Sequence, residues 1–163
     1  MSDKLSKRKS YVGKGEKDNS PTPQWFYDFI VRELGFVDVC KDPNEFNFFI
    51  HTHPEKSYCN PPFSNKRPFI EKACQEAKKG KLIVMLLPAD FSTQWFVDAV
   101  WKCNATVVFI AGARLHSKKA IFPSMLLIFN NKREIYLVHI NQLKEFLKKY
   151  LLGSELNLNS LKK

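Results

Sequence analysis

The chain has 163 residues and a mass of 19.0 kDa, a length that suits one domain with or without tails. Its 26 Lys and Arg residues outnumber the 16 Asp and Glu residues, and the resulting net charge of +10 favours a polyanionic partner. No apolar run approaches the ~20 residues that cross a bilayer, and the basic first residues lack the apolar stretch of a signal peptide. We therefore expect neither a membrane protein nor a secreted one.

Three segments differ in composition. Residues 1–19 carry six Lys or Arg and few apolar side chains, so we predict a flexible basic N-terminal tail. Residues 153–163 are predicted to be a flexible C-terminal tail. Residues 20–152 alternate strand and helix patterns, and they are predicted to form a single domain.

The elements of this domain follow from apolar spacing, caps and breakers. The first helix should begin near Thr22-Pro23, because Thr caps helices well and Pro is tolerated in the first turn, and it should end at Gly35. The clearest strand is 81–87, a continuous apolar run that stops at Pro88 and suits burial on both faces. The remaining predictions are strands at 36–40, 46–50, 57–59, 105–111, 124–129 and 134–138, and helices at 66–79, 93–102 and 141–152.

This alternation of strands and helices predicts an α/β fold of three layers with a mostly parallel sheet. The last two strands, joined by the short segment 130–133, are predicted to form an antiparallel hairpin at the edge of the sheet. Ligands bind beyond the carboxyl ends of parallel strands, so segments 40–44, 60–65 and 88–92 should share one rim.

The four cysteines (Cys40, Cys59, Cys74 and Cys103) are scattered and include no Cys-x-x-Cys pair. We expect reduced thiols and, with them, a cytoplasmic protein. No metal site is expected, because His51 and His53 with Cys59 nearby are too few ligands for a structural zinc.

The segment Asn60-Pro61-Pro62-Phe63, directly after a predicted strand, points to a particular chemistry. An exocyclic amino group of a base is a poor nucleophile, because its lone pair is delocalised into the ring. The Asn60 side-chain oxygen and the Pro61 carbonyl could accept hydrogen bonds from that amine and stabilise the charge that grows during attack. The two prolines hold the backbone in place, and Phe63 offers a face for an extruded base. The same residues also suit an ordinary turn with a buried Phe63.

Several motifs in a fixed order resemble the phage-type DNA N6-adenine methyltransferase (Dam) family. They are Thr22-Pro-Gln-Trp25, Leu34-Gly-Phe36, Cys59-Asn-Pro-Pro-Phe-Ser64, Val84-Met-Leu-Leu-Pro-Ala89, Thr93-Gln-Trp-Phe96 and Ile121-Phe-Pro-Ser124. The resemblance covers about residues 20–131. It implies a Rossmann-like methyltransferase sheet, S-adenosylmethionine as the cofactor, and N6 of adenine in DNA as the methyl acceptor, in the cytosol of a host cell if a phage encodes the protein.

The resemblance also assigns roles to residues. It makes Asn60, Pro61, Pro62 and Phe63 the catalytic motif, and it gives Thr22, Pro23, Asp38 and Asn44 to the cofactor, with Asp38 at its charged amino acid part. Basic side chains beside the motif or on a connector between strands are predicted to contact nucleic acid: Lys66, Arg67, Arg114, Lys118 and Lys119.

Two alternatives stay open. Only 21 residues, 39 to 59, separate Asp38 from Asn60, and no glycine-rich loop follows the first strand. These departures are the basis of the first alternative, a catalytically silent methyltransferase-fold protein that binds nucleic acid or a protein partner. The second alternative keeps the chemistry and changes the acceptor to RNA or to a protein glutamine, because Asn-Pro-Pro-aromatic motifs serve planar amides and amines alike.

Overall fold

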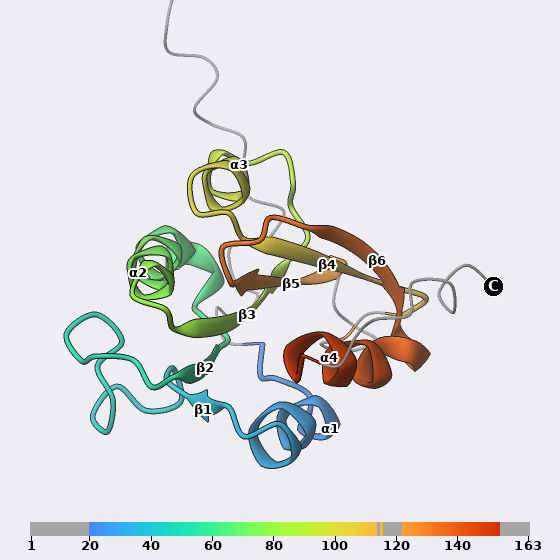
Figure 1. Ribbon diagram of the computed structural model, residues 1–163, viewed down its shortest axis with the longest axis horizontal. Helices are drawn as coiled ribbons and strands as arrows, with labels where there is room; N and C mark the ends of the chain where they lie inside the picture. The colour runs from blue at the N-terminus through green and yellow to red at the C-terminus, as the bar shows by residue number, and fades with distance from the viewer. Residues whose placement is uncertain (1–19, 114, 116–121, 154–163) are drawn as a thin grey trace, which may run out of the picture.

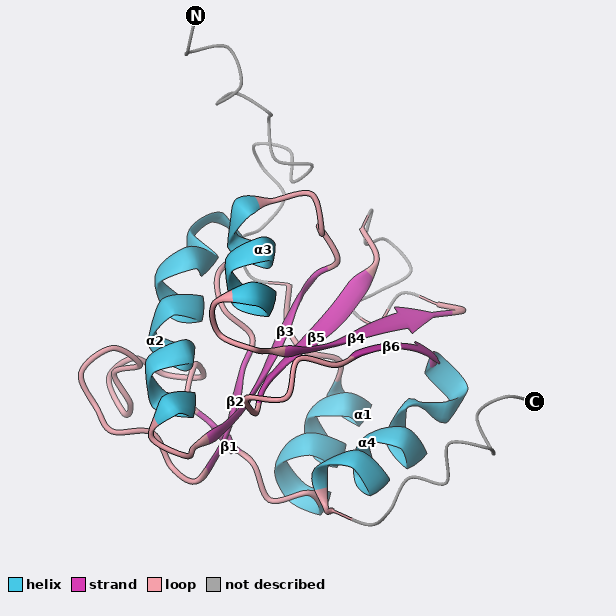
Figure 2. Ribbon diagram, turned by 45° about the horizontal axis from the view of Figure 1, so that its top comes forward, coloured by secondary structure: helices cyan, strands magenta, loops and turns pink. Residues whose placement is uncertain are grey.

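The computed structural model describes residues 20–113, 115 and 122–153. Within them, one six-stranded sheet has helices on both faces (Figures 1 and 2). The predicted tails, apart from Gly153, lie outside the described residues, and so do three predicted nucleic-acid contacts, Arg114, Lys118 and Lys119.

The strand order is β1-β2-β3-β5-β4-β6. Strands β1, β2 and β3 are mutually parallel, β4 is parallel to β6, and β5 is antiparallel to both of its neighbours, β3 and β4. The sheet is therefore mostly parallel, with one reversed strand in its interior. The strands are β1 (Val37–Asp38), β2 (Lys56–Cys59), β3 (Leu82–Pro88), β4 (Thr106–Ala111), β5 (Ser124–Phe129) and β6 (Ile135–His139).

The predicted edge hairpin of the last two strands is wrong. Strand β4 lies between β5 and β6, and β6 runs parallel to β4, with Val107 opposite Ile135. Every residue of β5 is buried, whereas β6 alternates between exposed and covered positions. A continuously apolar strand buries both faces only inside a sheet, which is the physical reason that β5 leaves the edge.

Helices cover the sheet from both sides. Helices α2 (Lys66–Lys78) and α3 (Gln94–Trp101) lie on one face, and α1 (Gln24–Tyr27) and α4 (Leu143–Leu151) lie on the other (Figure 2). A π-helical turn, η1 (Asp28–Glu33), continues α1, and short 3-10 turns precede α2 and α4 at η2 (Phe63–Asn65) and η3 (Ile140–Gln142).

Alternate residues of β3 serve the two resulting cores. Ile83, Met85 and Leu87 pack with the α2 and α3 side, whereas Val84 and Leu86 pack with the α1 and α4 side. This period of two divides one apolar strand between two layers. Among the described residues, no helix combines the length and the apolar character that a membrane span requires.

The strand predicted at 46–50 is wrong, because the segment between β1 and β2 folds into turns. The Asn47 side-chain oxygen accepts a hydrogen bond from the Phe49 backbone N–H at 3.0 Å. Such side-chain contacts to nearby backbone compete with strand pairing. Phe48 is buried, and its ring centroid lies 4.8 Å from that of Phe69 on α2, so the segment's apolar residues pack against a helix instead of entering the sheet.

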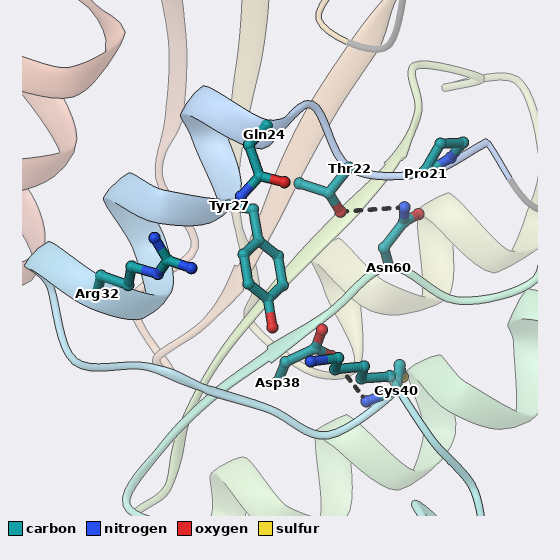
Figure 3. Close-up of a pocket in the computed structure, with 9 residues that line it drawn as sticks. Pro21, Thr22, Gln24, Tyr27, Arg32, Asp38, Cys40 and Asn60 are labelled. Carbon is teal, nitrogen blue, oxygen red and sulfur yellow. Dashed lines mark hydrogen bonds between the residues drawn. The ribbon is translucent and has the colours of Figure 1, made fainter.

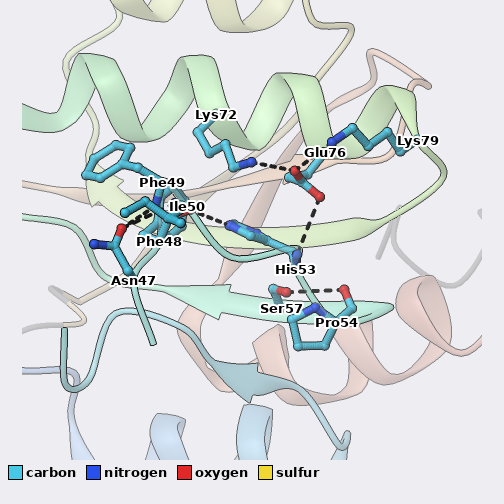
Figure 4. Close-up of polar contacts among 10 residues, drawn as sticks. All are labelled: Asn47, Phe48, Phe49, Ile50, His53, Pro54, Ser57, Lys72, Glu76 and Lys79. Carbon is cyan, nitrogen blue, oxygen red and sulfur yellow. Dashed lines mark hydrogen bonds and ion pairs between the residues drawn. The ribbon is translucent and has the colours of Figure 1, made fainter. Parts of the chain in front are cut away.

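A buried carboxylate on α2 fastens this turn segment to the fold (Figure 4). Glu76 accepts hydrogen bonds from the ammonium groups of Lys72 at 2.6 Å and Lys79 at 3.1 Å, and from the His53 backbone N–H at 3.4 Å. Burial alone would raise the pKa of Glu76, but the hydrogen bonds and charges of the two lysines together lower that pKa to about 2. We call Glu76, Lys72, Lys79 and His53 the Glu76 cluster.

The His53 side chain is buried within this cluster. Its Nε2 lies 2.9 Å from the Phe48 carbonyl oxygen. A carbonyl only accepts, so Nε2 carries the proton of the neutral ring. Burial lowers the pKa of His53, which favours this neutral form, and Nδ1 has no hydrogen-bond partner within the described residues.

The expectation of four reduced, unpaired thiols is wrong for this structure. One disulfide joins Cys40, after β1, to Cys59 at the end of β2, and a second joins Cys74 on α2 to Cys103 after α3. The paired cysteines are 19 and 29 residues apart in the sequence, so no short motif indicated either pair. The fold brings their Cα atoms to 5.2 and 5.3 Å. The cysteines therefore give no support to a cytoplasmic location.

Candidate active site

A polar pocket of about 460 Å³ lies where β1 and β2 end (Figure 3). Because β1, β2 and β3 are parallel, their carboxyl ends meet at one edge, as predicted. The volume falls within the ~300–1,000 Å³ that small-ligand sites commonly have. The lining residues are Pro21, Thr22, Gln24, Tyr27, Arg32, Asp38, Cys40, Lys41 and Asn60.

The pocket brings together three of the predicted site residues from separate segments: Thr22 before α1, Asp38 on β1 and Asn60 after β2. Two predicted cofactor residues, Pro23 and Asn44, are not among the described residues that line it. Asn44 is exposed, and its backbone N–H donates to the Asp42 carboxylate at 2.8 Å.

Sequence reasoning missed four polar residues of the pocket. They are Gln24, Tyr27, Arg32 and Lys41. The first three lie along the polar side of the α1–η1 helix, opposite the apolar side that carries Phe26, Phe29 and Ile30. The polar side of this helix is the sequence signal that could have indicated these residues. The π-helical turn weakens that signal, because it moves the spacing of the polar residues away from the α-helical period.

Asn60 is held by the segment that precedes α1. Its side-chain nitrogen, Nδ2, donates to the Ser20 carbonyl oxygen at 2.8 Å and to the Thr22 hydroxyl at 3.2 Å. The Thr22 hydroxyl in turn lies 2.7 Å from the hydroxyl of Tyr58, a buried residue of β2. A chain of three side chains thus connects the interior of the sheet to the pocket.

Asp38 supplies a partly buried carboxylate to the same pocket. Its Oδ1 accepts a hydrogen bond from the Cys40 backbone N–H at 3.0 Å, and the Tyr27 hydroxyl points toward it (Figure 3). Burial raises the pKa of Asp38 above its ordinary value, although these hydrogen bonds and the charge of Lys41 oppose the shift. Burial and the neighbouring Asp38 charge also raise the pKa of Tyr27, so Tyr27 remains a hydrogen-bond donor at neutral pH.

The other residues of the Asn-Pro-Pro-Phe segment are not among those that line the pocket, and they lead into a 3-10 turn. Pro62 has φ −57° and ψ 128°, and the turn begins at Phe63. The Phe63 side chain is buried and meets the Phe122 ring edge to face, with centroids 5.3 Å apart. Stacking of Phe63 on an extruded base stays a prediction.

Two predicted nucleic-acid contacts lie at the start of α2. The Lys66 ammonium donates to the Phe63 carbonyl at 2.6 Å and lies 5.2 Å from the centroid of the Trp95 ring. Arg67 forms ion pairs with Glu71 and Asp98 of the protein itself. A contact of Lys66 or Arg67 with phosphate stays a prediction. Within the described ranges, no group of three or more His, Cys, Asp or Glu residues is placed to hold a metal ion.

These features define a class of site: the Asn60 amide is held directly after a parallel strand, beside a small polar pocket to which the neighbouring strand adds the Asp38 carboxylate. A polar pocket at the carboxyl ends of parallel strands in an α/β sheet is typical of proteins that bind a small ligand there. The chain belongs to the DNA N-6-adenine-methyltransferase (Dam) family, whose model matches residues 9–149.

Two phage proteins of known description are similar to the chain. The DNA N-6-adenine-methyltransferase of Haemophilus phage HP1 is 28% identical over 148 aligned residues, which cover 76% of this chain and 85% of that protein. The DNA N-6-adenine-methyltransferase of Escherichia phage T1 is 45% identical over 42 residues, which cover 26% of this chain and 18% of that protein. The first similarity extends over most of both proteins, and the second is confined to a short segment.

Proposed function

We propose that the protein is a Rossmann-like, S-adenosylmethionine-dependent methyltransferase that acts on N6 of adenine in DNA. One observation carries the proposal: in a chain of the Dam family, Asn60 of the Asn-Pro-Pro-Phe motif and Asp38 of the adjacent parallel strand line the same pocket. The helices on both faces of a mostly parallel sheet support the Rossmann-like assignment. A protein that modifies DNA in a host cell would work in the cytoplasm.

The donor set of the pocket fits the amino acid end of S-adenosylmethionine, which carries an ammonium and a carboxylate. Asp38 would accept hydrogen bonds from the ammonium, and Arg32 and Lys41 would attract the carboxylate. When bound, the cofactor supplies an electrophilic methyl group on its sulfonium. Pro23 and Asn44 are not among the lining residues of the pocket. We therefore assign the cofactor contacts to Asp38, Arg32 and Lys41 instead.

The acceptor side of the reaction falls to Asn60. Both of its described side-chain hydrogen bonds use Nδ2, which leaves Oδ1 available to accept from the adenine amino group. The Pro61 carbonyl would be the second acceptor, held by the fixed proline backbone. These two oxygens stabilise positive charge as it develops on N6 during attack. The base has to leave the helical stack to reach this position.

DNA binding would draw on the net charge of +10. Neutralisation of phosphates by Lys and Arg releases counterions, so the affinity should fall steeply as salt rises. Lys66 and Arg67 remain proposed contacts, and each would have to exchange a partner within the protein for a phosphate.

Replacement of Asn60 tests the proposal. We expect Asn60→Ala to lower methyl transfer from radiolabelled S-adenosylmethionine to DNA by about 10²–10³-fold, because one preorganised group at the reacting atom is lost. The variant should still unfold in one cooperative transition, because the two lost hydrogen bonds of Nδ2 cost only about 1–2 kcal/mol. Asn141→Ala is the matched control, since Asn141 is an exposed asparagine in η3.

Three outcomes would contradict the proposal. Turnover by Asn60→Ala equal to that of the wild type removes the catalytic role of Asn60. Methylation of RNA or of a glutamine-containing peptide in preference to DNA changes the acceptor. Calorimetry that detects no binding at millimolar S-adenosylmethionine replaces the enzyme by a silent binding protein.

A further inference from the structure

The orientation of the Asn60 amide decides whether Asn60 can act. The two ends of an asparagine amide have nearly the same shape, and half a turn about the last side-chain bond exchanges oxygen and nitrogen. Only the oxygen can accept a hydrogen bond from an amino group. An Asn60 nitrogen in that position would present hydrogens to hydrogens, so the catalytic geometry needs a means of selecting one orientation.

The Ser20 carbonyl fixes which end of the amide is which. It lies 2.8 Å from the terminal amide atom assigned as Nδ2. A carbonyl oxygen can only accept, so the group that faces it must be the NH2. The Thr22 hydroxyl makes a second contact with the same nitrogen at 3.2 Å. Both hydrogens of the NH2 group are then engaged, and within the described residues no group donates to Oδ1 of Asn60.

The position of the Thr22 hydroxyl is itself fixed from the interior of the sheet. The Tyr58 hydroxyl lies 2.7 Å away, and the Tyr58 side chain is fully buried. Its ring meets the ring of Phe26 on α1 at a centroid distance of 6.2 Å. The Tyr58 side chain is therefore held in place, and it connects Thr22 to β2, the strand that directly precedes Asn60.

We infer that Tyr58 and Thr22 are positioning residues, which orient the Asn60 amide so that its oxygen faces the target amine. The inference rests on the proposed catalytic role of Asn60. It gives Thr22 a different task from the predicted cofactor contact: Thr22 acts on the methyl acceptor side, through Asn60. It also gives a function to the Tyr58 hydroxyl, which the sequence did not single out.

Two substitutions of Thr22 separate these tasks. Thr22→Val keeps the shape and removes the hydroxyl, whereas Thr22→Ser keeps the hydroxyl. We expect Thr22→Val to lower kcat for DNA methylation about tenfold, the effect of one neutral hydrogen bond lost, because the Ser20 carbonyl still holds the amide. The dissociation constant for S-adenosylmethionine should change by less than about twofold. Thr22→Ser should restore kcat to near the wild-type value.

Tyr58→Phe tests the inner end of the chain. Its kcat should fall less than that of Thr22→Val, about threefold, because Thr22 keeps its own contact with Asn60. In the double variant Thr22→Val/Tyr58→Phe, kcat should be no lower than in Thr22→Val alone, since the two hydroxyls act through one chain of contacts.

The chain offers a matched control, because a second Tyr–Thr–Asn group lies away from the pocket. Thr106 donates to Asn130 at 3.1 Å, Asn130 donates to Tyr150 at 2.9 Å, and the Thr106 and Tyr150 hydroxyls are 3.1 Å apart. Thr106→Val removes the same hydroxyl from a buried position, so it should lower thermal stability and leave kcat unchanged.

The inference and the proposed function fail in different ways. If Asn60→Ala is inactive and Thr22→Val keeps the wild-type kcat, the positioning role is wrong and the proposed function stands. A Thr22→Val variant that loses cofactor affinity at unchanged kcat makes Thr22 a cofactor contact and also overturns the inference. If Asn60→Ala keeps full activity, both fall. A kcat loss in Thr106→Val as large as in Thr22→Val would show that the effect is general destabilisation, which likewise overturns it.

Discussion

The same three residue types form two groups with different properties. Tyr150, Thr106 and Asn130 close a triangle in which each side chain contacts the other two. Tyr58, Thr22 and Asn60 form an open line instead, with Asn60 at the end that reaches the pocket.

The difference lies in the asparagine oxygen. Asn130 Oδ1 accepts from the Thr106 hydroxyl and from the Lys132 backbone N–H, so its hydrogen-bonding capacity is used within the protein. Asn60 uses only its nitrogen on described residues. A satisfied polar group stabilises a fold, whereas an acceptor that is held in place and left available can serve a ligand. The comparison predicts that changes beside the pocket alter binding and turnover, and that changes in closed polar groups alter stability.

After Asn60→Ala, the largest effect is expected at Asp38. We expect Asp38→Asn to weaken S-adenosylmethionine binding roughly 100-fold, since it removes the charge opposite the cofactor's ammonium and keeps the shape. Burial raises the pKa of Asp38, so this carboxylate takes up a proton at higher pH than an ordinary Asp. Wild-type affinity should therefore fall as the pH is lowered toward that raised pKa, and Asp38→Asn should lack this dependence.

Isothermal titration calorimetry across pH 4 to 8 measures both expectations for Asp38. Asp90→Asn is the control, because Asp90 lies on the loop after β3 and its carboxylate accepts a hydrogen bond from the nearby Ser92 hydroxyl. Equal affinities for the wild type and Asp38→Asn would remove Asp38 from the cofactor site.

The next largest effect is expected in the Glu76 cluster, and on stability alone. Glu76→Gln should lower the free energy of unfolding by about 2 kcal/mol at pH 7, less than the full pKa shift implies because Lys79 is exposed to solvent. The pKa of Glu76 is lowered from 4.5 to about 2, so its contribution is complete above pH 4.5 and is lost as the pH falls toward 2.

Urea unfolding of the wild type and Glu76→Gln at pH 7, 4 and 2.5 follows this contribution. The two curves should approach each other as the pH falls, while kcat at pH 7 should be the same for both proteins. A constant difference at every pH would mean that Glu76 acts through packing and not through its charge.

The smallest effect is expected at Tyr150. Tyr150→Phe should cost about 1 kcal/mol of unfolding free energy, because a hydroxyl bonded to Asn130 and Thr106 is removed from a half-buried site. Methyl transfer should be unchanged, in contrast to Tyr58→Phe. Thermal unfolding and initial rates, measured on both variants together, would contradict the comparison if the two changes had the same effect on kcat.

The local pattern predicted most of the elements, and it singled out Asn60, which the structure places in the pocket. The periodic apolar residues placed α2, α3 and α4 correctly, and the helix end at Gly35 is confirmed by its φ of +75°. Asn60 could be singled out because three features occur within a few residues: an asparagine, two prolines directly after it, and a predicted strand directly before it. Local signals of this kind need no knowledge of distant contacts.

Most of the failures involve contacts between distant segments. Residues 46–50 have the apolar character of a strand. They do not pair in the sheet, because the Asn47 side chain bonds to nearby backbone and Phe48 packs on α2. The two disulfides and the position of β5 between β3 and β4 depend on which elements become neighbours. Tyr27 on α1 and Arg32 on η1 reach the pocket because the α1–η1 helix lies beside the end of β1.

The amino-acid sequence by itself determined the kinds of elements, the Asn-Pro-Pro-Phe motif and the basic charge, since propensity, spacing and composition are properties of short segments. The tertiary structure alone decided the strand order, the pairing of the cysteines and the line from Tyr58 through Thr22 to Asn60. These features join distant residues: 38 positions separate Thr22 from Asn60, and 46 separate Ile83 of β3 from its partner Phe129 on β5. Contacts at that range form only when packing of the whole sheet brings their segments together, and for that reason the orientation of the Asn60 amide cannot be read from its neighbours in the chain.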